Sequence, residues 1–355
     1  MPADALRSFT EAIRVAATGG TRLRIRGGGT KDFYGQALEG AILDTRAYAG
    51  LVAYDPTELV ITVRGGTPLA EVERVLAEKR QMLAFEPPHF GPGATIGGAV
   101  AAGLSGPRRA TAGAVRDFVL GVRMMDGRGQ DLTFGGQVMK NVAGYDVSRV
   151  MAGALGTLGV ILEVSLKVLP LPVAEATLKF EMPRDKAIEA MNRWGAKPLP
   201  ISATAYTDGD LGVRLSGAAA AVKEACATLG GERVGDVESG RFWAGIREQA
   251  DAFFGGDEPL WRLSVPSTTP PLALEGRELV EWGGALRWLK SRAEARTIRE
   301  AAARAGGHAA LFRGGDKSAG VFHPLAPALA RIHARLKAEF DPHGVLNRGR
   351  LYPEF

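Results

Sequence analysis

The chain has 355 residues, 46% hydrophobic and 23% charged, which is typical of a globular protein long enough for two separate cores. Its formal charge of +5 comes from basic residues scattered among acidic ones, so we expect small anionic ligands and no nucleic-acid partner. The single cysteine, Cys226, excludes internal disulfides, a CxxC motif and iron–sulfur ligation within this chain. Any electron transfer would therefore need a cofactor.

The first residues predict a surface helix over 4–17, because Leu6, Phe9, Ile13 and Ala16 recur near helical spacing before a glycine pair. Acidic and other polar residues interrupt this segment, so it is neither a signal peptide nor a membrane span. We therefore expect a cytoplasmic protein that contacts the inner membrane only peripherally, through a partner.

The following elements are short and alternate with glycine. Residues 22–26 alternate as a strand and run directly into a loop over 27–31, whose three glycine amides can converge on a phosphate. Further predicted elements are strands over 41–44 and 59–63 and a helix over 68–80 with Thr67 as its N-cap.

The segment over 86–129 is the richest in glycine and contains paired prolines. Glycine permits positive φ and lets a flat or anionic ligand lie against backbone amides, so we interpret the segment as a ligand cradle and not as helix or strand. The residues over 99–103 are too small to fill space themselves. Residues 117–126 and 130–134 predict a hairpin closed by an Asp-Gly turn. The alternative is a glycine-rich surface loop.

A third glycine group has GxxGxxG spacing at Gly153, Gly156 and Gly159. A dinucleotide-binding fingerprint must follow a strand and open a helix, whereas here the glycines precede an alternating strand over 160–168. The sequence therefore disfavours a nicotinamide-binding Rossmann domain, and it contains no GxxxxGK[ST] phosphate loop.

These glycine motifs together resemble a known flavoprotein family. RGGGT at 26–30, ATIGG at 94–98, GTLGV at 156–160 and the tail DPHGVLNRGRL at 341–351 resemble the FAD-binding domain of the vanillyl-alcohol-oxidase or PCMH type, although Arg348 replaces the usual proline. The resemblance implies an α+β fold, with a two-subdomain FAD-binding domain and a smaller α+β cap domain. We expect an FAD-binding domain over 1–170, a cap over 171–338 and a returning tail over 339–355.

KNVAGYDVSRVMAGALGTLGVI at 140–161 and EWGGALRW at 281–288 are similar to the FAD-binding E subunits of bacterial glycolate oxidases. This resemblance implies an oxidoreductase subunit that binds FAD and supports assembly or relays electrons. A sister FAD subunit would oxidise glycolate to glyoxylate and an iron–sulfur subunit would carry the electrons onward. Two alternatives stay open: a self-sufficient FAD-dependent 2-hydroxy-acid oxidoreductase, and a structural subunit without a cofactor.

The resemblance also implies which residues hold the flavin. The first loop would wrap the pyrophosphate, the second group would line the ribityl chain and isoalloxazine, three residues would lie near the adenosine, and the tail asparagine would approach the ring. The first loop has no histidine or cysteine and His89 is displaced, so we expect FAD to bind non-covalently. The predicted residues are Arg26, Gly27, Gly28, Gly29, Thr30 and Lys31; Pro88, Gly93, Ala94, Thr95, Gly97, Gly98, Gly103 and Gly113; Asp117, Val119 and Ile161; and Asn347.

Catalytic residues cannot be assigned from the sequence. The chain lacks the GDGNLH-type motif of the full-length dehydrogenases, and its five histidines show no ligand spacing, so we expect no metal site. A base and a carboxylate-binding cation are needed for hydroxy-acid oxidation. Arg287, His323, Arg313 and Lys317 could supply this base or cation, or each could have a purely structural role. Trp282 and Trp288 could lie over the flavin or build the core of the cap. Tyr145 and Asp146 could form a turn beside the flavin ring or cap a helix.

Overall fold

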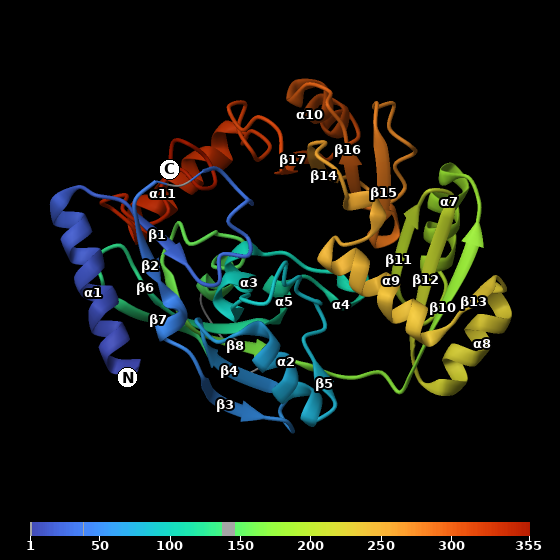
Figure 1. Ribbon diagram of the computed structural model, residues 1–355, viewed down its shortest axis with the longest axis horizontal. Coiled ribbons are helices and arrows are strands. Elements are labelled where there is room, and N and C mark those ends of the chain that lie inside the picture. The colour runs from blue at the N-terminus through green and yellow to red at the C-terminus, as the bar shows by residue number, and fades with distance from the viewer. Residues whose placement is uncertain (1, 38, 137–145) are drawn as a thin grey trace.

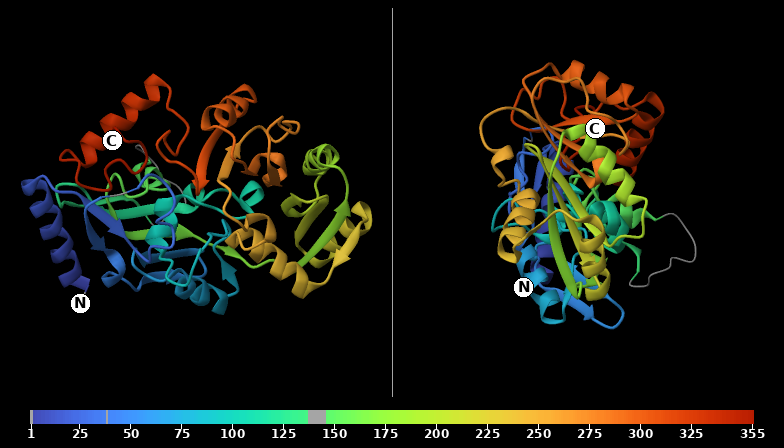
Figure 2. Two further views of the ribbon diagram at one scale, coloured as in Figure 1. Left: turned by 45° about the horizontal axis from the view of Figure 1, so that its top comes forward. Right: turned by 90° about the vertical axis from the view of Figure 1, so that its right-hand side faces the viewer.

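The computed structural model describes residues 2–37, 39–136 and 146–355. Within them, a five-stranded sheet and an eight-stranded sheet organise two halves of the chain, and two strand pairs complete the β structure. The halves lie side by side along the long axis of the molecule, as both Figure 1 and Figure 2 show. Across the described residues, every helix is too short or too polar to cross a bilayer.

The N-terminal helix and the first strand pair form a small layer at one end of the molecule (Figure 1). Helix α1 (Pro2–Gly19) is followed by the parallel strands β1 (Leu23–Arg26) and β2 (Ala41–Asp44). Phe9 and Ile13 of α1 are buried against Leu23, Leu43 and the tail of the chain. The predicted helix and both strands are therefore confirmed.

The five-stranded antiparallel sheet has the order β3-β4-β8-β6-β7. The hairpin of β6 and β7 and the strand after the third glycine group are confirmed, and β3 is a strand that the sequence did not predict. The bounds are β3 (Leu51–Asp55), β4 (Val60–Arg64), β6 (Val119–Met125), β7 (Asp131–Gly135) and β8 (Val160–Lys167), with the pair β5 (Gln81–Met82) and β9 (Leu169–Pro170) nearby.

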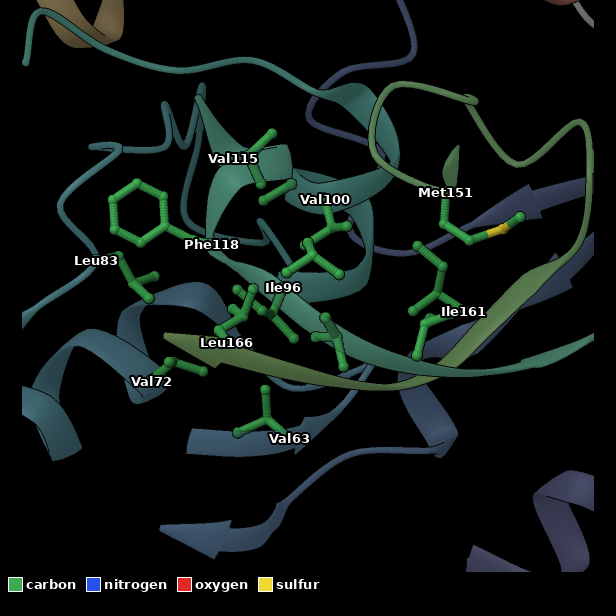
Figure 3. Packing of buried hydrophobic residues seen from close by; sticks show 14 of the residues in the cluster. Val63, Val72, Leu83, Ile96, Val100, Val115, Phe118, Met151, Ile161 and Leu166 are labelled. Atoms are coloured by element: carbon green, nitrogen blue, oxygen red, sulfur yellow. The ribbon is translucent and has the colours of Figure 1, made fainter. Parts of the chain in front are cut away.

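Short helices pack on this sheet and bury its apolar face. Ile96 and Val100 from α3 meet Val63 of β4 and Leu166 of β8, with Phe118 closing the side of the cluster (Figure 3). The helices are α2 (Leu69–Glu78), α3 (Ile96–Ala102), α4 (Arg109–Ala112), α5 (Val115–Phe118) and α6 (Val147–Val150), with the 3-10 turn η1 (Thr45–Ala47).

Two predictions in this half are wrong. The segment over 86–129 is not free of helix, because Ile96–Ala102 form α3, in which Ala99 and Val100 are buried against the sheet while Ala101 and Ala102 line the cleft described below. Thr67 does not cap α2, since its hydroxyl donates to the Arg64 carbonyl (2.7 Å) and accepts from the Gly50 amide (2.9 Å), while Pro68 occupies the N-cap. In both cases tertiary contacts outweighed the local pattern.

The eight-stranded antiparallel sheet has the order β13-β10-β12-β11-β15-β16-β14-β17, and all its strands lie between residues 174 and 313. The strands are β10 (Ala174–Glu181), β11 (Ile201–Thr207), β12 (Asp210–Gly217), β13 (Glu232–Val234), β14 (Leu260–Ser264), β15 (Arg277–Glu281), β16 (Leu286–Lys290) and β17 (His308–Arg313). The helices are α7 (Arg184–Gly195), α8 (Ala219–Leu229), α9 (Asp236–Glu248) and α10 (Ala295–Arg304), with turns η2 (Ala252–Phe254) and η3 (Trp282–Gly284).

Side chains along β14 alternate between the two faces of this sheet, and the two faces pack against different parts of the chain. Trp261 and Leu263 pack with Ile298 of α10, whereas Leu260 packs with Tyr34 in a cluster shared by both halves of the chain. One face of the second sheet is therefore directed toward the N-terminal half. The predicted boundary at residue 170 stays a prediction.

The last helix brings the chain back to its beginning. Helix α11 (Pro327–Phe340) runs from the second half to lie over the N-terminal half in Figures 1 and 2. The following tail joins β1, because the Leu23 amide donates to the Val345 carbonyl (2.8 Å) and the Asn347 amide donates to the Leu23 carbonyl (3.0 Å). Residues more than 300 positions apart in the sequence thus become neighbours.

Candidate flavin site

A cleft in the N-terminal half brings the glycine loops and the tail together. Its walls come from β1 and the loop after it, the start of α3, the loop before β8, and the tail. The lining residues are Arg24, Ile25, Arg26, Gly27, Gly28, Gly29, Thr30, Lys31, Asp32, Thr45, Gly65, Thr95, Gly97, Gly98, Ala101, Ala102, Leu155, Gly156, Gly159, Ile161, Asn347 and Arg350.

The loops approach one another backbone to backbone, which only glycine permits here. A Cβ at Gly28 would lie 1.5 Å from the Gly93 carbonyl oxygen, and a Cβ at Gly97 would lie 2.7 Å from the Gly65 oxygen. Gly156 has a φ of +72°, a conformation that L side chains rarely adopt. Side chains at these positions would push the loops apart and fill the cradle that the motif forms.

Asn347 fixes the tail to strand β1 and to the loop before β8. Its Oδ1 accepts from the Ile25 amide (2.8 Å), and its Nδ2 donates to the Leu155 carbonyl (2.6 Å). The side chain is 5% exposed, so these hydrogen bonds are made away from water. Asn347 therefore positions the wall of the cleft.

The charged lining of the cleft is mainly basic. Arg24, Arg26, Lys31 and Arg350 contribute cations, against the single carboxylate of Asp32, which pairs with Arg26 at 2.8 Å. Basic groups beside converging backbone amides suit an anionic pyrophosphate.

Lys31 is the most perturbed of these groups. Desolvation by burial lowers the pKa of Lys31 to about 8, although Glu248 partly opposes this change. Its Nζ donates to the His89 carbonyl (3.2 Å) and lies 5.5 Å from the centre of the Phe90 ring. A nearby anion would favour the protonated form.

Most of the predicted flavin residues lie in this cleft: the whole first loop, Thr95, Gly97, Gly98, Ile161 and Asn347. Others lie outside it, including Val119, which is 1% exposed in the core, and Asp117, whose carboxylate accepts from the Ala114 amide (2.8 Å). The remaining residues outside the cleft lining are Pro88, Gly93, Ala94, Gly103 and Gly113.

Several lining residues of the cleft were not predicted from the sequence. Gly156 and Gly159 were visible as a glycine pattern, but Arg24 and Arg350 gave no signal. Arg350 reaches the cleft because its guanidinium donates to the carbonyls of Asp32 (3.0 Å) and Gln36 (2.8 Å), which follow the first loop.

A smaller cavity lies where the two halves meet. The N-terminal half contributes Phe90 and Ser105, and the second sheet contributes Arg262, Glu281 and Trp288. Desolvation by burial raises the pKa of Glu281 to about 7, opposed by the hydrogen bond from Trp288 and the charge of Arg262. This is the most perturbed carboxylate at the interface.

The cationic side chains that were candidates for catalysis donate hydrogen bonds within the protein. Arg287 is fully buried and donates to the carbonyls of Gly284 and Thr269 (2.6 and 2.7 Å). Lys317 donates to the carbonyls of Phe33 and Gly35 (both 2.8 Å).

Arg313 donates to Gln249 Oε1 (2.9 Å). For His323 only the backbone carbonyl accepts, from the Tyr352 hydroxyl (3.0 Å), whereas its Nδ1 is buried without a hydrogen-bond partner in the described part of the chain. Trp282 and Trp288 are buried in the shared core. Asp146 caps α6, whereas Tyr145 lies outside the described residues. In the described part of the chain, no cluster of three or more His, Cys, Asp or Glu side chains is arranged to hold a metal ion.

Comparison with known proteins agrees with this geometry. Residues 6–149 match the FAD binding domain family. A solved structure of alkyldihydroxyacetonephosphate synthase superposes with a TM-score of 0.65 at 13% identity, covering 95% of this chain and 74% of that one. The fold and cleft therefore define a PCMH-type FAD-binding protein, and the predicted fold class and FAD cofactor are confirmed.

The chain is 49% identical to glycolate oxidase subunit GlcE of Escherichia coli (strain K12), over 99% of this chain and 98% of that protein. It is also 31% identical to glycolate oxidase subunit GlcD of Bacillus subtilis (strain 168), but over only 36% of this chain and 27% of that protein. A D-lactate dehydrogenase of Anaerostipes hadrus matches at 33% over 36% of this chain and 26% of that protein. The chain thus belongs to the family of the glycolate oxidase subunit GlcE.

Proposed function

We propose that this chain is the FAD-holding subunit of a glycolate oxidase complex, in which it binds FAD non-covalently and supports assembly or relays electrons. A sister FAD subunit and an iron–sulfur subunit would complete the complex, which oxidises glycolate to glyoxylate. Any membrane association would come through these partners. The full-length similarity to GlcE supports the proposal.

The observation that carries the FAD assignment is the basic cleft between the glycine loops. Amides of Gly27, Gly28 and Gly29 would bind the pyrophosphate, with Lys31 supplying a positive charge at the same loop. The bound flavin would supply a two-electron acceptor, chemistry that side chains alone lack. The close approach of the loops would exclude water from the buried part of the cofactor.

The visible spectrum of the purified chain, recorded before and after anaerobic addition of glycolate, tests the proposal. We expect a flavin spectrum that glycolate leaves oxidised in the isolated chain and reduces when the sister subunits are added. Reduction in the isolated chain would instead establish a self-sufficient 2-hydroxy-acid oxidoreductase. A colourless chain that takes up no FAD on incubation would establish a structural subunit and refute the proposal.

A further inference from the structure

The segment over 89–93 packs against the first flavin loop. The Gly93 carbonyl oxygen occupies the space that a Cβ at Gly28 would need, since the two would lie 1.5 Å apart. At the other end of the segment, the His89 carbonyl accepts from Lys31 Nζ (3.2 Å). The position of this segment therefore decides where the amides and the lysine of the first loop lie.

A carboxylate from the second half of the chain holds this segment. Glu248, the last residue of α9, accepts through Oε2 from the amides of His89 (3.0 Å) and Phe90 (2.8 Å). Its Oε1 accepts from Arg247 Nε (2.8 Å), and its side chain is 24% exposed. Hydrogen bonds to an ionised acceptor are stronger than those between neutral groups. Glu248 is thus an acceptor by which the second half fixes the segment.

Phe90 has a backbone conformation that needs such support. Its φ is +54°, in the left-handed region that side chains of this size rarely adopt. Its ring packs edge-to-face on Phe33 and Phe312, with centroids 5.6 and 6.2 Å away, and the Arg313 guanidinium lies 5.6 Å from the ring centre. Strained backbone persists where surrounding contacts over-determine it and is common at ligand sites. Three of the residues that hold Phe90, including Glu248, belong to the second half of the chain.

The charge of Glu248 also acts on Lys31. Both side chains bind His89, Lys31 at its carbonyl and Glu248 at its amide. Desolvation by burial lowers the pKa of Lys31 to about 8, and the charge of Glu248 opposes this change. Removing that charge would therefore make Lys31 easier to deprotonate. The other titratable groups adjacent to these two residues, or in contact with the residues between them, are Asp32, Glu73, His89, Arg247, Arg313 and Arg350.

We propose that Glu248 is a positioning residue for FAD, by which the second half of the chain holds segment 89–93 and keeps Lys31 charged for the pyrophosphate. Glu248 lies outside the cleft lining, so it acts through the segment and through Lys31. A loop and a cation that are already in place cost less free energy to order when the ligand binds. The inference rests on FAD binding at the glycine-loop cleft, as in the proposed function. It adds a contribution from residues 174–313, which supply none of the described lining of that cleft.

Titration of the apoprotein with FAD between pH 6 and pH 9, followed by flavin fluorescence, tests the inference. In the wild-type chain the Kd should rise as Lys31 loses its proton, with a midpoint near pH 8. Glu248→Gln keeps an oxygen for the two amides but removes the charge, so this midpoint should move at least about half a pH unit lower. Glu248→Asp keeps the charge on a shorter side chain. Its midpoint should stay near that of the wild type, while its Kd rises by up to about tenfold at every pH.

Glu238→Gln is the matched control, because Glu238 lies on the same helix α9 and is exposed, and it should reproduce the wild-type curve. The double variant Lys31→Gln/Glu248→Gln should show no midpoint in this pH range, because the titrating lysine is absent. A purely structural Glu248 would raise the Kd of Glu248→Gln equally at every pH. That result, an unchanged curve, or a midpoint that persists in the double variant would overturn the inference. A wild-type chain that takes up no FAD at any pH would instead refute the proposed function, and the inference with it.

Discussion

Lys337 joins three parts of the chain, and its replacement by methionine gives the most direct test of the tertiary structure. The ammonium group donates to the Thr157 carbonyl (2.8 Å), Asp341 Oδ2 (2.6 Å) and the Leu346 carbonyl (2.7 Å). Its side chain is 9% exposed, and that of Asp341 is fully buried. One cation thereby connects α11, the glycine loop before β8 and the tail.

We expect Lys337→Met to lower the free energy of unfolding, because the substitution removes the cation beside a buried carboxylate. Methionine fills a similar volume, but Asp341 would then be a buried carboxylate without its cation, although it still accepts from the Leu346 amide (2.8 Å). Removing one partner of a buried pair costs about 3–5 kcal/mol. Asn347 follows Leu346 directly, so we also expect weaker FAD binding.

Urea unfolding followed by circular dichroism measures the free energy, and FAD titration of the apoprotein measures the affinity. Lys186→Met is the matched control, because Lys186 forms an ion pair with Glu189 (3.0 Å) while its side chain is 59% exposed. This exposed pair should contribute about 1 kcal/mol at most. A loss below about 1 kcal/mol for Lys337→Met would refute the reasoning, since such a value belongs to a solvated pair.

Three other variants test the cleft and the interface between the halves. Gly28→Ala should abolish FAD retention in gel filtration, because its Cβ would lie 1.5 Å from a backbone oxygen. The control Gly240→Ala, whose Cβ would have no neighbour within 4 Å, should retain FAD. An FAD-loaded Gly28→Ala protein would contradict the geometry of the loops. The pKa of Lys31 is about 8 in the free chain, so raising the pH from 7 to 9 deprotonates its ammonium group. A bound pyrophosphate favours the protonated form of Lys31, and the Kd for FAD should therefore rise by up to about tenfold over this pH range. Lys31→Gln should bind more weakly at pH 7 and show no such rise, and a rise of equal size in this variant would exclude Lys31 as its cause. Glu86→Gln should lower the free energy of unfolding by about 2 kcal/mol in urea titrations, because Arg214 would lose its charged acceptor. The side chain of Arg214 is 7% exposed, and its Nη2 lies 2.8 Å from the Glu86 carboxylate. An unchanged urea midpoint would show that the pair contributes little.

Local patterns in the sequence predicted much of the N-terminal half. The alternation of residues 160–168 became β8, and the Asp-Gly turn joined β6 to β7 as expected. The prediction failed where tertiary contacts decide, as at α3, whose glycine-rich sequence has low helix propensity but whose Ile96 and Val100 are buried against the sheet. The order of the eight-stranded sheet could not be predicted, because strands such as β11 and β15 pair across more than 70 residues.

The sequence by itself determined three glycine loops at strand ends, because closely approaching backbones require residues without a Cβ and each motif carries this requirement locally. The resemblance of these motifs to a flavoprotein family implied the FAD. Only the tertiary structure decided which other groups meet these loops. Arg350 reaches the first loop from the opposite end of the chain by donating to the Lys31 carbonyl (3.2 Å). Arg262 and Glu281 face one cavity because neighbouring strands align them. These contacts between distant residues depend on strand pairing and on the path of α11, and the spacing of residues along the chain does not encode them.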